Sequence, residues 1–474
     1  MITKTKDFFQ SNKYTQKLLL FFDSILYPIV MCSIIFLAYA TKLEVIGACL
    51  IVLILSVGLL LKDDLSVLFP ALLGFVFIIP YRGSFLKGEF SYPEYMIEHL
   101  PIIILLVVIL LIAFTLHFVL WGQVKKSNSK PSKLLFISLP LTLFFCINGF
   151  TNTDYTAKNF IMGLLNSFCI LWLSIIFVSN LRYDEKTIKA FFNTCTCIAV
   201  LLILQFIYAC CTLPIIKDGK INKYSIFLGW GTTNNYGNMG ALLLPAMFYM
   251  AYKSPKKQAI IYYIIGLLTF LATSLTLSRN AILTGGLIIA FSLIFLAVKG
   301  ENKLLFKKFL IGLIISFLAV IAVAIILICA LKIEINLFDD LINLGLNDNG
   351  RFGLWEDAFS AFLQYPIFGE GFYSCSFPSN TGFMPGFYHN TILHLLASCG
   401  IVTLILYLIY RVQTIKIILY KLNVEKIFLG LMVFIVVVSS LLDNFIFQFY
   451  PVFFYAIAIA LCELHVEKEE NNKN

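Results

Sequence analysis

Apolar runs long enough to cross a membrane recur from one end of this 474-residue chain to the other. A helix of about 17 to 25 mostly apolar residues spans the ~30 Å hydrocarbon core of a bilayer. Inside that core every backbone polar group needs a partner within the protein, which favours helices. We therefore expect an all-α polytopic membrane protein with about fourteen transmembrane helices. The runs cover residues 18–40, 44–61, 65–80, 100–121, 134–150, 159–179, 188–211, 237–252, 259–278, 281–298, 309–331, 391–412, 427–441 and 450–462.

Composition agrees with a membrane location. Hydrophobic residues make up 60% of the chain and charged residues 13%, so a soluble fold would present a largely apolar surface. The net charge of +9 could indicate a nucleic-acid partner. However, the Lys and Arg residues lie mainly in alternate short loops, which is the pattern that sets membrane topology. We expect membrane lipid as a partner and no nucleic acid.

The positively charged loops also predict orientation. Residues 125–133, 253–257, 299–308 and 411–426 fall on the same side as the N-terminus if the number of spans is even. That side is expected to be cytoplasmic, so both termini lie inside the cytoplasmic membrane. We expect one transmembrane domain over residues 1–462, with a large extracytoplasmic loop at 332–390. A solvated, polar cytoplasmic tail is expected at 463–474.

The interval from Leu331 to Asn390 is where this chain can meet water. It is rich in Gly, Asn and charge, and it contains Asn349-Gly350-Arg351, Gly369-Glu370-Gly371 and Tyr388-His389-Asn390. A polar interval of this length between membrane helices is usually functional. We interpret it as an active-site loop on the outer side.

Arg279 can be placed by length alone. The apolar run from Ala259 to Val298 is twice as long as one span, so it must fold back near Ser278-Arg279-Asn280. A guanidinium is thereby held at the outer edge of the membrane. It either snorkels to the headgroups and sets helix depth, or it binds phosphate oxygens with its planar fork.

Arg351 begins a second candidate element. Phe352, Trp355, Phe359 and Phe362 follow it at helical spacing, which predicts a short amphipathic helix lying on the membrane. Arg351 would occupy the first turn, where the helix dipole disfavours a positive charge. It is either a surface charge or a functional group, and this local conflict favours function.

His389 stands just before the twelfth run. A histidine can exchange a proton with a sugar hydroxyl near neutral pH, although a single histidine can equally be a satisfied structural group. His394 lies five residues further on, off the same helix face, so a metal pair is not expected.

Two further polar segments could line the site. The segment Gly229 to Asn238 either contributes Asn235 to a polar surface or serves only as a loop rich in capping residues before the eighth run. Gly369-Glu370-Gly371 is either a turn or a means of placing Glu370 beside Arg351 or His389. The sequence contains no Asp-x-Asp, His-Glu-x-x-His or Gly-x-x-x-x-Gly-Lys motif, so we expect neither a metal nor a cofactor.

Taken in order, these motifs resemble those of the O-antigen ligase and O-antigen polymerase family of bacterial envelope glycosyltransferases. The resemblance runs from Thr232 to Gly400. It rests on Leu277-Ser278-Arg279-Asn280-Ala281, Asn349-Gly350-Arg351 with Leu354-Trp355, Tyr365-Pro366-Ile367-Phe368-Gly369-Glu370-Gly371, and His389-Asn390 with Leu393 and Gly400-Ile401. The segment from Gly231 to Asn235 departs from the looser Asn-centred pattern of the family.

The resemblance implies a type C glycosyltransferase-like membrane fold that acts, without a metal, on glycans carried by undecaprenyl diphosphate. Arg279 and Arg351 would then hold the diphosphate, and His389 would activate the hydroxyl of a sugar or lipid-sugar acceptor. This agrees with the chemistry, because fixed guanidinium groups stabilise a departing diphosphate. Trp355, Glu370 and Asn235 are expected to complete the substrate-binding site.

We therefore expect a polysaccharide polymerase or ligase of the cell envelope or capsule. The alternative from another class is a lipid-linked oligosaccharide flippase or other transporter, in which the arginines would guide an anionic headgroup without bond cleavage. A transporter is expected to show internal pseudo-symmetry and charges in mid-span, and the sequence shows neither. A structural assembly partner would leave the arginines and the histidine unexplained.

Overall fold

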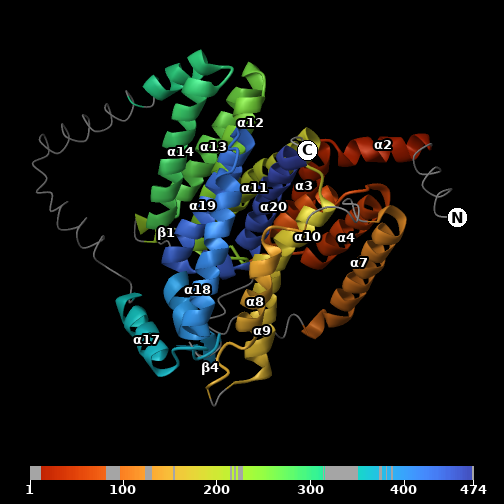
Figure 1. Cartoon of the computed structure of the whole chain (residues 1–474). Helices are drawn as coiled ribbons and strands as arrows, with labels where there is room; N and C mark the ends of the chain where they lie inside the picture. Colours follow the sequence, from red (N-terminus) through yellow and green to blue (C-terminus); the bar gives the residue numbers. More distant parts are fainter. Residues whose placement is uncertain are drawn as a thin grey trace, which may run out of the picture.

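The structure, a computed structural model, describes residues 12–81, 97–122, 131–152, 155–213, 228–312, 314, 351–372 and 388–471, and the strand backbones at 216–217, 220–221, 376–379 and 382–385. Helices dominate this part of the chain (Figure 1). The helices of the N-terminal half are α2 (Lys13–Phe22), α3 (Leu26–Thr41), α4 (Glu44–Leu61), α5 (Phe69–Gly74), α7 (Leu100–Trp121), α8 (Leu135–Cys146), α9 (Ala157–Ser167), α10 (Leu173–Asn180) and α11 (Glu185–Thr212). Those of the C-terminal half are α12 (Thr233–Lys253), α13 (Lys256–Leu275), α14 (Arg279–Lys299), α17 (Arg351–Gln364), α18 (Thr391–Leu419), α19 (Val424–Asp443) and α20 (Phe449–Asn471).

Short irregular elements join these helices. Single turns of 3₁₀-helix flank α5 at Leu65–Leu68 and Phe75–Ile78, and another, η6, covers Phe445–Phe447. A π-helical turn at Phe168–Trp172 joins α9 to α10. Two small antiparallel hairpins complete the described elements: β1 (Ile216–Lys217) pairs with β2 (Lys220–Ile221), and β3 (Ser376–Ser379) with β4 (Gly382–Pro385).

The chain is a multi-pass membrane protein. In the described part, nine helices are long and apolar enough to cross a bilayer, or ten if the bent pair α2 and α3 counts as one span. The expectation of an all-helical membrane fold is confirmed at this level. Most of the expected span at 309–331, and much of the expected outer loop at 332–390, lie outside the described residues.

The first expected span differs from the structure. The apolar run 18–40 is divided into α2 and α3, which are bent by 70° relative to each other. The break falls at Asp23 and Ser24. The hydroxyl of Ser24 donates to the carbonyl of Phe21 at 2.8 Å, and Asp23 forms an ion pair with Lys62 at 2.5 Å. Polar groups with local partners replace the helical hydrogen bonds here, so a continuous apolar run does not form one continuous helix.

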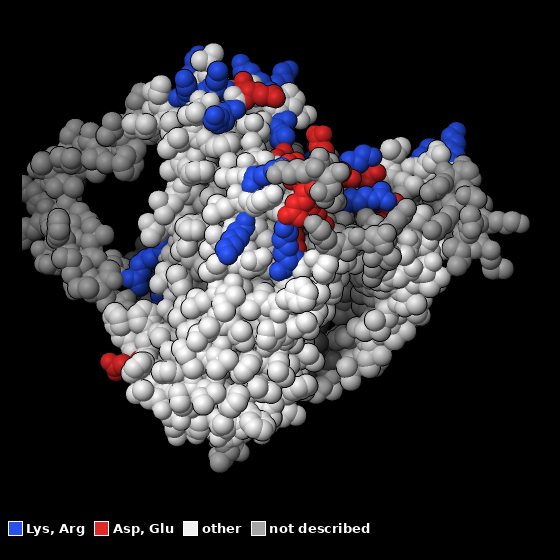
Figure 2. Space-filling model, viewed as in Figure 1, with Lys and Arg blue, Asp and Glu red and all other residues white. Residues whose placement is uncertain are grey.

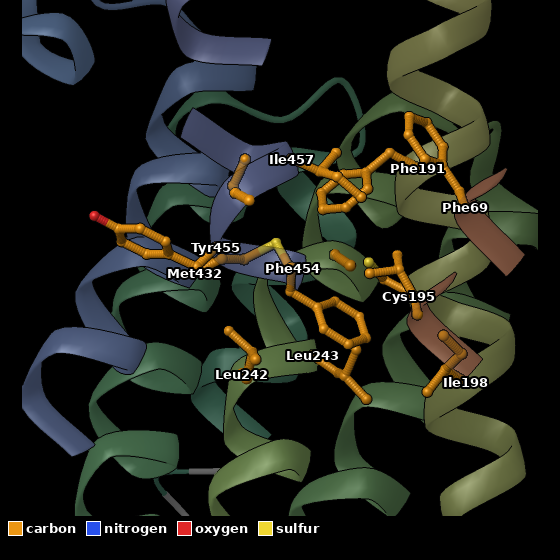
Figure 3. Packing of buried hydrophobic residues seen from close by; sticks show 14 of the residues in the cluster. Phe69, Phe191, Cys195, Ile198, Leu242, Leu243, Met432, Phe454, Tyr455 and Ile457 are labelled. Atoms are coloured by element: carbon orange, nitrogen blue, oxygen red, sulfur yellow. The ribbon is translucent and has the colours of Figure 1, made fainter. Parts of the chain in front are cut away.

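Helix α12 forms the centre of the bundle. Every residue from Tyr236 to Ala251 is buried, and α12 packs against α11, α13, α14 and α19. Figure 3 shows the neighbouring core, where side chains of α11, α12 and α20 gather, and the ring of Phe454 of α20 lies near Leu243 of α12 and Ile198 of α11. Because protein rather than lipid surrounds α12, this helix can carry Gly and Asn, and it is not among the nine helices that composition alone identifies.

The bundle has two chemically different ends. At the lysine end, uppermost in Figure 1, lie Lys253 of α12, Lys299 of α14 and Lys421 after α18. At the opposite histidine end lie Arg279 of α14 and His389 before α18. Figure 2 shows charged side chains gathered over the upper part of the visible face, whereas the lower part is almost without charge.

The C-terminal segment is not the solvated tail that the sequence suggests from residue 463 onward. Helix α20 continues to Asn471, and Glu463 is fully buried. Its carboxylate accepts hydrogen bonds from the hydroxyl of Ser132 at 3.0 Å and from the backbone N–H of Lys133. The polar residues at the start of this segment thus have partners inside the protein; residues 472–474 lie outside the described part.

Candidate active site

The segment from Pro366 to Gly371 is fixed in a break of α18. Gly400 of α18 has a non-helical conformation with φ +79°. Three backbone hydrogen bonds cross here: Glu370 N–H donates to Ala397 at 2.8 Å, Gly371 N–H to Ser398 at 2.9 Å, and Ile401 N–H to Pro366 at 2.9 Å. The carbonyls that the broken helix leaves without intrahelical partners are therefore satisfied by this segment.

Both backbone segments that meet at this crossing require a glycine. A Cβ on Gly400 would lie 2.1 Å from the carbonyl oxygen of Ile367, and a Cβ on Gly369 would lie 2.2 Å from the carbonyl carbon of Ser398. Both glycines also have positive φ, which L side chains adopt only with strain. The Gly369 and Gly400 positions quoted in the resemblance thus have a structural role: they fix the segment after α17 against α18.

The loop after α8 holds the same segment from its other side. The backbone N–H of Gly149 donates to the carbonyl of Phe368 at 2.7 Å, and the amide of Asn152 donates to the carbonyl of Glu370 at 2.9 Å. The backbone N–H of Phe372 donates to the side chain of Asn148 at 2.9 Å. These contacts make a rigid frame next to the start of α18.

His389 is positioned by the start of α18. It has φ +49°, and the next residue, Asn390, caps the helix by accepting from the N–H groups of Ile392 at 2.9 Å and Leu393 at 3.1 Å. Nδ1 of His389 donates to the carboxylate of Asp443 at 2.8 Å. The Asp443 side chain is 12% exposed and that of His389 is 39% exposed, so the acid lies behind a ring that solvent can reach.

Asp443 is in turn held at the end of α19. Asn444, which follows it, has φ +50° and accepts a hydrogen bond from the hydroxyl of Thr391 at 3.2 Å. Two adjacent side-chain contacts therefore join the start of α18 to the end of α19. Because the carboxylate fixes Nδ1 of His389 as the protonated nitrogen, Nε2 can accept a proton from another group. This pair has the geometry of a general base with an orienting acid.

Arg279 reaches the same end on another helix. It is the first residue of α14, after a turn in which Leu277 has φ +57°, and this confirms the predicted reversal at Ser278-Arg279-Asn280. The amide of Asn280 donates to the side chain of Asn238 in α12 at 3.0 Å. Helix α14 also packs against α19, which ends at Asp443. The Arg279 residue is exposed, as a group that meets a substrate must be.

Arg351 is the first residue of α17, so the predicted helix is confirmed. This helix packs on α18 through a small buried cluster of Ala358 with Tyr388 and Ala397. Trp355 contacts Phe352 with ring centroids 5.4 Å apart, and Phe352 itself is 59% exposed. Phe352 and Phe359 are thus exposed, whereas Trp355, Phe362 and Arg351 are half-buried.

Glu370 supports the residue before His389. Its carboxylate accepts a hydrogen bond from the hydroxyl of Tyr388, whereas the ring of His389 contacts Asp443. Burial raises the pKa of Glu370; the nearby charge of Asp357 raises it too, and the hydrogen bond from Tyr388 lowers it. Glu370 was expected to lie beside Arg351 or His389. The structure gives it a hydrogen bond with Tyr388, the residue directly before His389.

The side chain of Asn235 forms a hydrogen bond with Gln448, the residue just before α20. Its side-chain oxygen accepts from the amide of Gln448 at 3.2 Å, and Gln448 also accepts from the hydroxyl of Tyr450. Trp230, from the same loop as Asn235, packs against Tyr450 with ring centroids 5.6 Å apart. These contacts join α12 to α20 at the histidine end, which is a structural role for Asn235.

The structure brings the expected residues to one end of the bundle on different helices. The direct contact of His389 is with Asp443, a residue that lies outside the motifs on which the resemblance rests. Its signal was weak: a single acid at the end of an apolar run, followed by Asn444. In the described part, no three His, Cys, Asp or Glu side chains gather as metal ligands.

Part of the chain matches a known protein family. A family described as O-antigen ligase matches residues 264–408, from α13 to α18. The range contains Arg279, Arg351 and His389, whereas Asp443 lies beyond it. The resemblance drawn from the sequence motifs is confirmed over this range. No curated protein matches the chain in a sequence search.

Proposed function

We propose that the protein is a membrane glycosyltransferase, because residues 264–408 match a family described as O-antigen ligase. It transfers a glycan from undecaprenyl diphosphate to the hydroxyl of a sugar or lipid-sugar acceptor, as a polysaccharide polymerase or ligase. The observation that carries the proposal is the hydrogen bond between His389 and Asp443, at the end of the bundle where Arg279 begins α14.

One step accounts for the transfer. The acceptor oxygen attacks the anomeric carbon of the donor sugar, and the bond from that carbon to the phosphate oxygen breaks. The acceptor proton passes to Nε2 of His389, and the diphosphate leaves with the bonding electrons. Asp443 stabilises the imidazolium that forms, because its carboxylate already accepts from Nδ1.

The arginines supply positive charge to the leaving group. A diphosphate accumulates negative charge as the glycosidic bond breaks, and a guanidinium matches two phosphate oxygens at once. Arg279 is exposed at the start of α14, and Arg351 begins α17, which packs on the helix that follows His389. In this proposal both arginines hold the diphosphate, and Trp355 lines the binding site beside them.

The orientation follows from the two ends of the bundle. The lysine end carries the positive loops that favour the cytoplasm, so the histidine end faces outward from the cytoplasmic membrane. Helix α3 begins and α20 ends at the lysine end (Figure 1). Both termini are then cytoplasmic, and the reaction takes place on the outer face.

Three substitutions test the proposal in cells. Arg279→Ala, Arg351→Ala and His389→Ala are each expected to leave the amount of protein in the membrane unchanged and to abolish glycan transfer. Lipid-linked repeat units then accumulate on the outer leaflet. Lys299→Ala, at the lysine end of the same helix as Arg279, is the matched control and keeps transfer intact. Accumulation on the inner leaflet would instead favour the flippase alternative and overturn the proposal.

A further inference from the structure

A pair of asparagines joins the central helix α12 to the turn that carries Arg279. Asn238 of α12 is 1% exposed, and its side-chain oxygen accepts a hydrogen bond from the amide of Asn280 at 3.0 Å. Asn280 directly follows Arg279 in the first turn of α14. A side chain in the core of the bundle is therefore bonded to the residue next to the guanidinium.

The turn is packed closely against the same part of α12. A Cβ on Gly237, the residue before Asn238, would lie 2.9 Å from the Cβ of Ala281 and 3.1 Å from the Cβ of Ser278. Glycine at this position thus lets the residues on both sides of Arg279 approach α12. The hydrogen bond to Asn238 adds a fixed direction to this close packing.

Backbone hydrogen bonds inside the turn are local. The N–H of Leu277 donates to the carbonyl of Ser274 at 3.0 Å. Such a bond shapes the turn but does not fix where the turn lies relative to a neighbouring helix. The bond from Asn280 to Asn238, in contrast, crosses from α14 to α12.

The asparagine pair makes one hydrogen bond where two amides could make two. Nδ2 of Asn238 and Oδ1 of Asn280 are both buried, and neither has a hydrogen-bond partner in the described part of the chain. A buried donor and a buried acceptor without partners oppose folding. Apolar side chains at both positions would join the helices without this cost. The pair is therefore better explained by the position that it fixes than by the stability that it adds.

The position of Arg279 depends on how this turn is held. The Arg279 residue is exposed, so the place of its guanidinium follows from the place of its backbone. Leu277, two residues earlier, has φ +57°, which a leucine adopts only with strain. A strained conformation persists only where surrounding contacts hold it. The hydrogen bond between Asn280 and Asn238 is one such contact.

We propose that Asn238 is a positioning residue for Arg279. Asn238 acts through Asn280 and thereby holds the guanidinium where it meets the diphosphate. This inference rests on the proposed function, in which Arg279 binds the leaving diphosphate. It extends the site inward to a buried side chain that does not itself contact the substrate.

A double-mutant cycle on the purified full-length protein, assayed with a lipid-linked donor, tests this role. In the otherwise unmodified protein, Asn238→Ala is expected to lower kcat by about 10- to 100-fold, because a small displacement of the guanidinium weakens its fit to the transition state. In the Arg279→Ala protein the same change is expected to lower kcat by less than about twofold, because no guanidinium remains to be placed. Losses that multiply in the double variant would overturn the proposal.

Two further variants separate positioning from packing. Asn280→Ala removes the other half of the bond from a half-buried position, and it is expected to reproduce the loss seen in Asn238→Ala. The matched control is Asn193→Ala in α11, which removes another buried asparagine, one that accepts from the hydroxyl of Tyr262 at 3.4 Å. This control is expected to retain transfer. Equal losses in Asn193→Ala and Asn238→Ala would overturn the proposal in favour of a general effect on packing.

Hydrogen exchange of the backbone amides at residues 276–282 tests the hold on the turn without using transfer. These amides are expected to exchange faster in Asn238→Ala than in the unmodified protein, and at the unmodified rate in Asn193→Ala. Unchanged exchange in Asn238→Ala would overturn the proposal even where transfer is lost. Faster exchange with full transfer in both Asn238→Ala and Arg279→Ala would overturn it through the proposed function, because Arg279 would then have no part in transfer.

Discussion

The imidazole of His389 and the carboxylate of Asp443 are joined by a hydrogen bond of 2.8 Å although 54 positions separate them in the chain. His389 itself has a positive φ, and Asp443 is followed by Asn444, which also has a positive φ. The two turns bring the start of α18 and the end of α19 together. An orienting acid behind an accessible imidazole is the arrangement that a general base requires.

Replacing Asp443 by Asn tests this arrangement. An amide can donate to Nδ1 and thereby favour the tautomer whose Nε2 carries the proton, which cannot act as a base. We expect kcat for glycan transfer to fall by about 10²- to 10⁴-fold while KM for the lipid-linked donor changes little. The measurement is the rate of transfer by purified protein with a lipid-linked donor.

The control for Asp443→Asn is Glu356→Gln, which removes an exposed acid from α17. It is expected to retain the activity of the unmodified protein. Full activity in Asp443→Asn, or an equal loss in both variants, would show that the carboxylate behind His389 has no part in the chemistry.

Arg279 allows charge and shape to be separated. Arg279→Lys keeps the positive charge but loses the planar fork that binds two oxygens together. Arg279→Ala removes both and is expected to lower kcat by about 10²- to 10³-fold, with Arg279→Lys between this variant and the unmodified protein. Equal activities for Arg279→Lys and Arg279→Ala in the same transfer assay would mean that the fork matters and charge alone does not. Unchanged activity in both would remove Arg279 from the site.

The sequence predicted those features that depend on local pattern. The turn at Arg279 follows from the length of one apolar run, and α17 follows from aromatic residues at helical spacing. Both signals lie within a few tens of residues. Family resemblance added His389, which composition could not distinguish from a structural histidine.

Features that depend on distant packing could not be predicted in this way. The hydrogen bond between His389 and Asp443 joins the turn before α18 to the last residue of α19. Burial of α12 on all sides arises from its neighbours and not from its own hydropathy. The break after α2 lies in a run that remains apolar on both sides of Asp23 and Ser24. Each of these depends on contacts between segments that a one-dimensional pattern does not relate.

Glu370 gives a prediction about pH. Burial raises its pKa in the folded protein above the ordinary value for Glu, and the charge of Asp357 adds to this. A group with a raised folded pKa contributes stability that is present at low pH and lost as the pH rises through the folded pKa. We therefore expect the unmodified protein to lose stability as the pH rises from the ordinary Glu pKa through the raised one. Glu370→Gln removes this part of the dependence.

Two further variants test the assignment to Glu370. Tyr388→Phe removes the hydrogen bond that lowers this pKa, so the loss of stability with rising pH is expected to extend to higher pH. Glu356→Gln changes an exposed acid and leaves the dependence as it is. Thermal unfolding from about pH 4 to about pH 8 measures all four proteins. An unchanged pH profile in Glu370→Gln would contradict the assignment.

The close contact of Gly400 with the Pro366–Gly371 segment predicts that alanine at position 400 destabilises the protein much more than alanine at position 353. A Cβ at Gly400 would overlap the carbonyl of Ile367, and the crossing backbone cannot move away because hydrogen bonds hold it on both sides. Positive φ adds strain of about 1–2 kcal/mol, and overpacking adds about 1–3 kcal/mol. Gly353 lies inside α17, and a Cβ added there would meet no atom within 4 Å. Gly353→Ala is therefore expected to be neutral or to stabilise the helix by up to about 1 kcal/mol.

Thermal unfolding of the two purified variants measures this difference, and it should show a marked loss of stability for Gly400→Ala and none for Gly353→Ala. The crossing also frames Tyr388 and His389, because the segment that passes Gly400 carries the carboxylate that accepts from Tyr388. Transfer activity should therefore fall together with stability in Gly400→Ala and stay unchanged in Gly353→Ala. Equal behaviour of the two variants in both measurements would show that this contact does not hold the site.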